Sequence, residues 1–104
     1  MAIVGVSISP VGEGIGVSDY VAGALRVLEE SGLEYEVGPM FTSIEGDLDR
    51  VLAVIRGMQE SMFERGAGRV STVMKIDDRR DRAHSMKGKM QSVRKHLEAQ
   101  EGSL

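Results

Sequence analysis

Charged side chains that could hold a polar ligand follow directly on a strand-like stretch at residues 69–82 (RVSTVMKIDDRRDR). Val70, Thr72, Met74 and Ile76 alternate along the first half, which predicts a strand over residues 70–77. The second half, residues 77–82, consists of charged residues alone (DDRRDR). Such a cluster at a strand end could bind a polar ligand or a neighbouring subunit, or its charges could pair among themselves in solvent.

Other residues whose side chains could bind a ligand or take part in catalysis give weaker signals. The glycine loop at residues 12–16 (GEGIG) lies between a predicted strand and a predicted helix, but it lacks the GxGxxG spacing and a P-loop lysine. His84 and His96 are 12 residues apart and form no ligand set with metal spacing. No motif pairs a nucleophile with a base. We therefore predict no nucleotide site, no metal site and no catalytic residue.

The second half of the chain is basic, with eight bases and three acids in residues 75–95. RNA-binding sheets stack bases on exposed aromatic side chains. This chain has two Phe and two Tyr, and none lies in the strand predicted at residues 70–77. We therefore predict no nucleic-acid partner.

The composition is that of one globular domain over residues 1–104, with 41% hydrophobic and 28% charged residues. It contains no long apolar run and no basic-then-apolar leader, so we expect no membrane insertion and no export. Without cysteine it can form no disulfide, and the cytoplasm is the expected location. Residues 1–50 hold nine acids and two bases, whereas residues 51–104 hold eleven bases and seven acids. These opposite charges could attract each other within the fold or between subunits.

Hydrophobic periodicity predicts the elements that position these groups. We expect strands at residues 2–9, 33–36, 40–45 and 70–77, and helices at 19–31, from 47 to a stop at Gly66, and at 85–100. Ser18 and Asp47 are the expected helix caps, Gly32 is the expected helix stop, and Gly38-Pro39 separates the second and third strands. This β-α-β-β-α-β order with a terminal helix predicts an α+β, ferredoxin-like sandwich on a four-stranded antiparallel sheet.

One face of such a sheet is left without helices. The alternation does not tell which residues of each strand take that face, but either choice puts several apolar side chains there. The last helix also carries only a narrow apolar stripe (Met86, Met90, Val93 and Leu97). Both features predict association between subunits.

The chain resembles the small thiamine-binding, ferredoxin-like family, long listed among proteins of unknown function. The matching stretches are SISPVG at 7–12, SDYVA at 18–22, GLEYEVGPMFTSIEG at 32–46 and RVSTVMKIDDRRD at 69–81. The family usually has a small residue where this chain has Phe41. The resemblance implies a subunit that pairs through its sheet into dimers and tetramers and binds thiamine or a related pyrimidine without known catalysis.

Thiamine carries a thiazolium cation, an aminopyrimidine and a hydroxyethyl tail. A site for it needs a carboxylate, hydrogen-bonding groups and an apolar wall. Residues 40–45 supply a thioether, a ring, two hydroxyls and a carboxylate, while basic side chains suit a hydroxyl or phosphate tail. The resemblance thus implies the following ligand-binding residues: Ser7, Ser9, Met40, Phe41, Thr42, Ser43, Glu45, Lys75, Asp77 and Arg79.

Two alternatives stay open from the sequence. Arg79 or Arg80 could instead pair with a carboxylate of a neighbouring subunit, which would make the chain a structural or regulatory assembly module without a small ligand. An enzyme acting on a pyrimidine or phosphorylated substrate would need a general base, for which Asp77 and Glu45 are the candidates.

Overall fold

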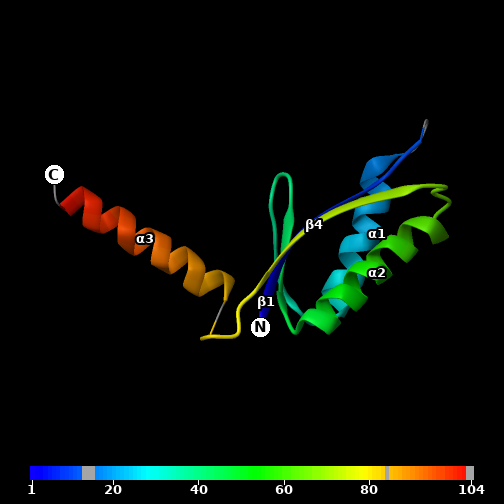
Figure 1. Ribbon diagram of the computed structural model, residues 1–104. Helices are drawn as coiled ribbons and strands as arrows, with labels where there is room; N and C mark the ends of the chain where they lie inside the picture. The colour runs from blue at the N-terminus through cyan, green and yellow to red at the C-terminus, as the bar shows by residue number, and fades with distance from the viewer. Residues whose placement is uncertain (13–15, 84, 103–104) are drawn as a thin grey trace.

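The computed structural model describes residues 1–12, 16–83 and 85–102 of the chain (Figure 1). Its elements are β1 Ala2–Pro10, α1 Val17–Glu30, β2 Glu34–Val37, β3 Thr42–Gly46, α2 Leu48–Glu64, β4 Val70–Asp78 and α3 Met86–Gly102. The strands form one antiparallel sheet in the order β2-β3-β1-β4. The predicted ferredoxin-like α+β fold with an added C-terminal helix is confirmed.

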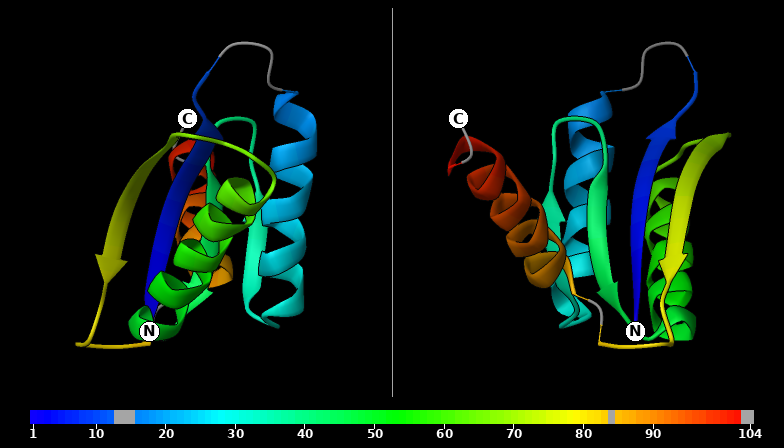
Figure 2. Two further views of the ribbon diagram at one scale, coloured as in Figure 1. Left: turned by 90° about the vertical axis from the view of Figure 1, so that its right-hand side faces the viewer. Right: turned by 60° about the vertical axis from the view of Figure 1, so that its left-hand side comes forward.

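Helices α1 and α2 pack against one face of the sheet and leave the opposite face, here called the open face, without a helix of that pair (Figure 2). Val4 and Val6 of β1 point toward the helices and are almost fully buried. They meet Leu28 of α1, Ile44 of β3 and Val51 of α2 in the hydrophobic core. Because side chains alternate across a strand, the odd-numbered residues of β1 lie on the open face.

The helix ends match the expected signals with one exception. Asp47 caps α2, since its carboxylate accepts a hydrogen bond from the backbone N–H of Arg50 at 3.3 Å. Gly32 has a left-handed φ of +74° just after α1, as expected for a helix stop. The prediction that Ser18 caps α1 is wrong, because the helix begins at Val17, two residues before its predicted start, and its N-cap residue is Gly16.

The third strand begins later than predicted. The backbone N–H of Gly38 donates a hydrogen bond to the carbonyl oxygen of Phe41 at 2.9 Å, which closes a turn over residues 38–41. The turn leaves Met40 and Phe41 outside β3, which starts at Thr42. Met40 is therefore 79% exposed.

Helix α3 extends away from the sheet and from the other two helices (Figure 1). Its expected apolar stripe is present but uncovered, because Met90, Val93 and Leu97 are each more than half exposed. An isolated helix of this length is marginally stable in water, so α3 needs a covering surface. In the described ranges, no helix has the length and apolar character that crossing a membrane requires.

Candidate functional site

The open face brings together six of the ten residues predicted to bind a ligand. In an antiparallel pair, residues opposite each other in the register point to the same side of the sheet. Gly5 of β1 lies opposite Ser43 of β3 and opposite Lys75 of β4, and Ile3 lies opposite Glu45 and Asp77 in the same way. The six residues on this face are Ser7, Ser9, Ser43, Glu45, Lys75 and Asp77.

Gly5 forms a bare floor in the middle of this group. A Cβ atom added to Gly5 would meet no other atom within 4 Å, so the space above it is open. With strands spaced about 4.8 Å apart, Ser43 and Lys75 stand roughly 10 Å from each other on either side of this floor. A flat ring can therefore approach the main chain here between a hydroxyl and an ammonium group.

Two carboxylates stand one step further along the strands, toward the N-terminal end of β1. Glu45 and Asp77 flank Ile3, whose side chain is only 9% exposed. Within the described residues, Glu45 and Lys75 make no side-chain hydrogen bond or ion pair. Both groups are therefore available to a ligand. Glu45 and Asp77, with Glu34 of β2 opposite Glu45, form the negative end of the face.

The open face is more polar than the sequence led us to expect. The register places Met74 on the helix side, and Phe41 lies in the turn rather than on the strand. Ile3 and Val73 are the apolar side chains that the described strands present on this face. Exposed apolar residues also lie at the β4 edge, where Met74 and Ile76 extend beyond the cover of the helices, and on α3.

Thr42 lies on the opposite face from Ser43. Its register partner is Val6, whose side chain points into the core. Thr42 borders a cavity of about 50 Å³ between the sheet and the two packed helices, together with Ile8 of β1 and Met58 and Met62 of α2. A ligand on the open face therefore does not reach the Thr42 hydroxyl.

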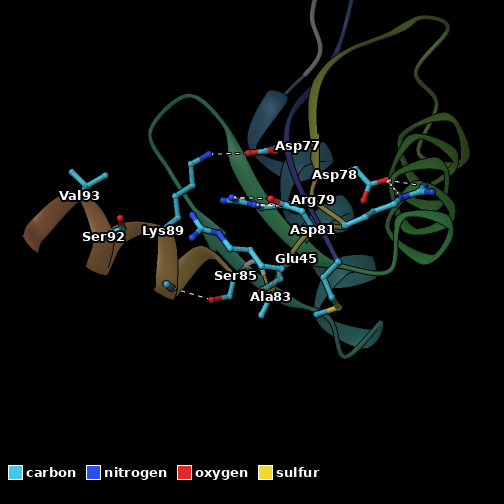
Figure 3. Close-up of a pocket in the computed structure, with 14 residues that line it drawn as sticks. Glu45, Asp77, Asp78, Arg79, Asp81, Ala83, Ser85, Lys89, Ser92 and Val93 are labelled. Carbon is cyan, nitrogen blue, oxygen red and sulfur yellow. Dashed lines mark hydrogen bonds and ion pairs between the residues drawn. The ribbon is translucent and has the colours of Figure 1, made fainter. Parts of the chain in front are cut away.

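The charged end of β4 faces α3 across an open pocket of about 1140 Å³ (Figure 3). Arg79 donates two hydrogen bonds to Asp81, from Nε to Oδ1 at 2.7 Å and from Nη2 to Oδ2 at 3.2 Å. This bond lowers the pKa of the Asp81 carboxyl and raises that of Arg79. Arg80 similarly bonds to Asp78 at 3.0 Å. Both arginines thus have carboxylate partners in their own chain, two residues away.

Lys89 of α3 reaches across this pocket to the open face. Its Nζ lies 3.1 Å from Oδ2 of Asp77, and Figure 3 shows the side chain extending from the helix to the strand end. No pattern in the sequence indicates this contact, because the direction of a terminal helix cannot be read from its periodicity. Gly5 could have been predicted from the sequence as part of the site, because a glycine inside a strand often marks a place where a ligand or another backbone approaches closely.

The remaining candidates add little to the site. His84 and part of the glycine loop at residues 12–16 lie outside the described residues. Nδ1 of His96 lies 2.8 Å from the carbonyl oxygen of Ser92 on the exposed surface of α3. Across the described ranges, the acids and His96 form no group of three that could hold a metal ion.

Residues 4–94 match the family described as thiamine-binding protein. The UPF0045 protein YqgV of Bacillus subtilis is 44% identical over 103 residues, which cover 94% of this chain and 99% of that one. The solved structure of the hypothetical protein MJ1052 of Methanocaldococcus jannaschii is 33% identical, with a TM-score of 0.80 over 88% of this chain and 94% of that one. A Thermotoga maritima structure, described as a proposed thiamine biosynthesis/salvage protein, has the same fold with a TM-score of 0.76 over 88% and 97% of the two chains, at 21% identity.

Proposed function

Because this chain belongs to the thiamine-binding protein family, we propose that it is a non-catalytic, cytoplasmic, homo-oligomeric protein that binds thiamine or a related pyrimidine on its open face. The observation that carries the proposal is the ring of polar side chains, from three neighbouring strands, around the bare floor at Gly5. Family membership supports the ligand class, and the geometry of the open face supports the proposed position of the ligand.

The two halves of thiamine suit the two parts of this face. The aminopyrimidine lies flat over Gly5, where the Ser43 hydroxyl and the Lys75 ammonium bond to its edge. The thiazolium cation lies toward Glu45 and Asp77, because a partly shielded carboxylate stabilises a cation better than water-exposed dipoles do. The hydroxyethyl tail, or a phosphate on it, extends from the thiazolium toward Arg79 at the end of the strand. Ser7 and Ser9 lie beyond the pyrimidine, on the other side of Gly5 along β1.

Isothermal titration calorimetry of the purified protein with thiamine tests the proposal. We expect a saturable heat and a rise in melting temperature, since a ligand that binds only the folded state stabilises it. Choline at the same concentration is the control, because it carries a quaternary cation without a pyrimidine. The absence of both heat and a melting shift at millimolar thiamine would overturn the proposed ligand class.

Two neighbouring residues of β3 tell which face holds the ligand. Ser43→Ala removes a hydroxyl from the open face, and we expect about a two- to ten-fold loss of thiamine affinity, equivalent to one hydrogen bond. Thr42→Val removes a hydroxyl from the helix side and keeps the size of the side chain. We expect an unchanged dissociation constant for thiamine. The reverse pattern in the titrations would contradict binding on the open face.

A second candidate function is that of an assembly module without a small ligand. The uncovered apolar stripe of α3 and the exposed edge of β4 favour it, because monomeric proteins seldom leave such surfaces bare. Under this alternative, light scattering shows a stable oligomer while every ligand screen stays blank.

A further inference from the structure

Lys89 places its ammonium group near Asp77, where the thiazolium cation of the proposed ligand would also lie. Its ammonium group lies 3.1 Å from the carboxylate of Asp77, one of the acids at the negative end of the open face (Figure 3). Lys89 comes from α3, which otherwise extends away from the sheet (Figure 1). Asp77 thus already has a cation partner supplied by a separate element of the chain.

We propose that Lys89 is an internal competitor that sets the specificity of the open face for cationic ligands, an inference that rests on the function proposed above. A thiazolium cation that approaches Asp77 displaces the Lys89 ammonium, whereas a neutral pyrimidine over Gly5 leaves the pair intact. Asp77 cannot bond fully to both cations. The free energy of binding of a cationic ligand is therefore reduced by the free energy of the Lys89–Asp77 contact, whereas that of a neutral ligand is unchanged.

The exposure of the pair sets the size of this effect. The side chains of Lys89 and Asp77 are 56% and 44% exposed, so water screens the pair on both sides. Exposed ion pairs of this kind change an equilibrium by up to about five-fold. Arg79 also acts on Asp77 through its charge, and Glu45 stands across Ile3 from it. Both residues are present in every variant compared below, so their influence on Asp77 is common to all of them.

Competition also couples the ligand to α3. By thermodynamic linkage, a ligand that weakens the Lys89–Asp77 contact is itself weakened by that contact to the same degree. Thiamine binding therefore weakens the Lys89–Asp77 contact between the start of α3 and the sheet. The chain has no cysteine, so a nitroxide attached to a Gln91→Cys variant reports the mobility of this helix alone.

The test compares Lys89→Met with Lys87→Met by calorimetry at pH 8. Both variants remove one lysine charge from the same turn of α3, but no ion pair is seen for Lys87 in the described part of the chain. The probes are thiamine and the neutral 4-amino-5-hydroxymethyl-2-methylpyrimidine. We expect Lys89→Met to bind thiamine about two- to five-fold more tightly than the wild type, with the neutral pyrimidine unchanged. Lys87→Met should match the wild type with both probes.

The outcomes separate the two proposals. Equal thiamine affinity in Lys89→Met and the wild type, or equal tightening for both probes, overturns the role of Lys89 and leaves the proposed function standing. The absence of thiamine binding in all three proteins overturns the proposed function and the inference with it. A nitroxide at residue 91 that becomes more mobile with thiamine but not with the neutral pyrimidine supports the competition directly, and equal mobility with both contradicts it.

Discussion

A valine at position 5 should weaken thiamine binding about ten- to one-hundred-fold, the range expected when extra atoms are forced into an occupied contact. The variant Gly5→Val places a branched side chain on the bare floor between Ser43 and Lys75. A ring that lay flat on the main chain would have to rise off the sheet and lose its edge contacts. Titration calorimetry on the variant and the wild type measures the change.

The same substitution should leave the fold at least as stable. The added Cβ meets no atom within 4 Å, so it causes no clash in the protein alone. Glycine weakens a strand, and a β-branched residue is favoured there by up to about 1 kcal/mol. We therefore expect urea unfolding to show an equal or raised midpoint. Weaker thiamine binding together with higher stability would show that Gly5 serves ligand binding and not the stability of the fold.

Gly68→Val is the matched control for this experiment. An added Cβ at Gly68 also meets nothing within 4 Å, but this glycine lies in the turn before β4, away from the site. It should bind thiamine as the wild type does. If Gly5→Val also retains wild-type affinity, the ligand does not lie over Gly5 on the open face.

The sequence predicted the fold well because its signals are local. Alternating apolar residues and glycine stops determine which segments become strands and helices, and their order determines the ferredoxin-like topology. The cap at Asp47 and the stop at Gly32 followed the same local rules. Ser18 failed as a cap because α1 begins at Val17, two residues before the predicted start, so Ser18 lies inside its first turn.

The site was harder to predict because it depends on contacts between segments. Ser43 and Lys75 become neighbours of Gly5 only through the strand register, which one sequence does not fix. Thr42 and Ser43 looked equivalent in the sequence, yet adjacent strand residues point to opposite faces. The contact of Lys89 with Asp77 depends on how α3 leaves the sheet, for which the residues between β4 and α3 give no rule.

The observed strand register also changes the prediction of which surface forms the subunit contact. The predicted sheet-to-sheet pairing relied on a half-apolar open face, but the described part of that face is mainly polar. Exposed apolar side chains on α3 and at the β4 edge offer a subunit contact instead. A subunit contact through these two surfaces would leave the floor at Gly5 accessible, so oligomer formation and ligand binding need not compete for one face.

Replacing Val93 with glutamate should therefore break the oligomer into monomers of 11.3 kDa. Val93 lies between Met90 and Leu97 on the uncovered stripe of α3. A carboxylate buried in an apolar subunit contact is left without a partner and costs several kcal/mol, about enough to dissociate an assembly at micromolar concentration. Light scattering coupled to size-exclusion chromatography measures the mass.

Helix content gives this prediction a second, independent measurement. A 17-residue helix that carries Gly88 and no covering partner is marginal in water, so α3 should lose helicity once its contact is gone. We expect the circular dichroism at 222 nm to weaken in Val93→Glu. Gln91→Glu adds the same charge on the other side of the helix and should keep both mass and helicity. A wild-type protein that is already monomeric, or a Val93→Glu variant that stays assembled, would show that subunits do not meet through α3.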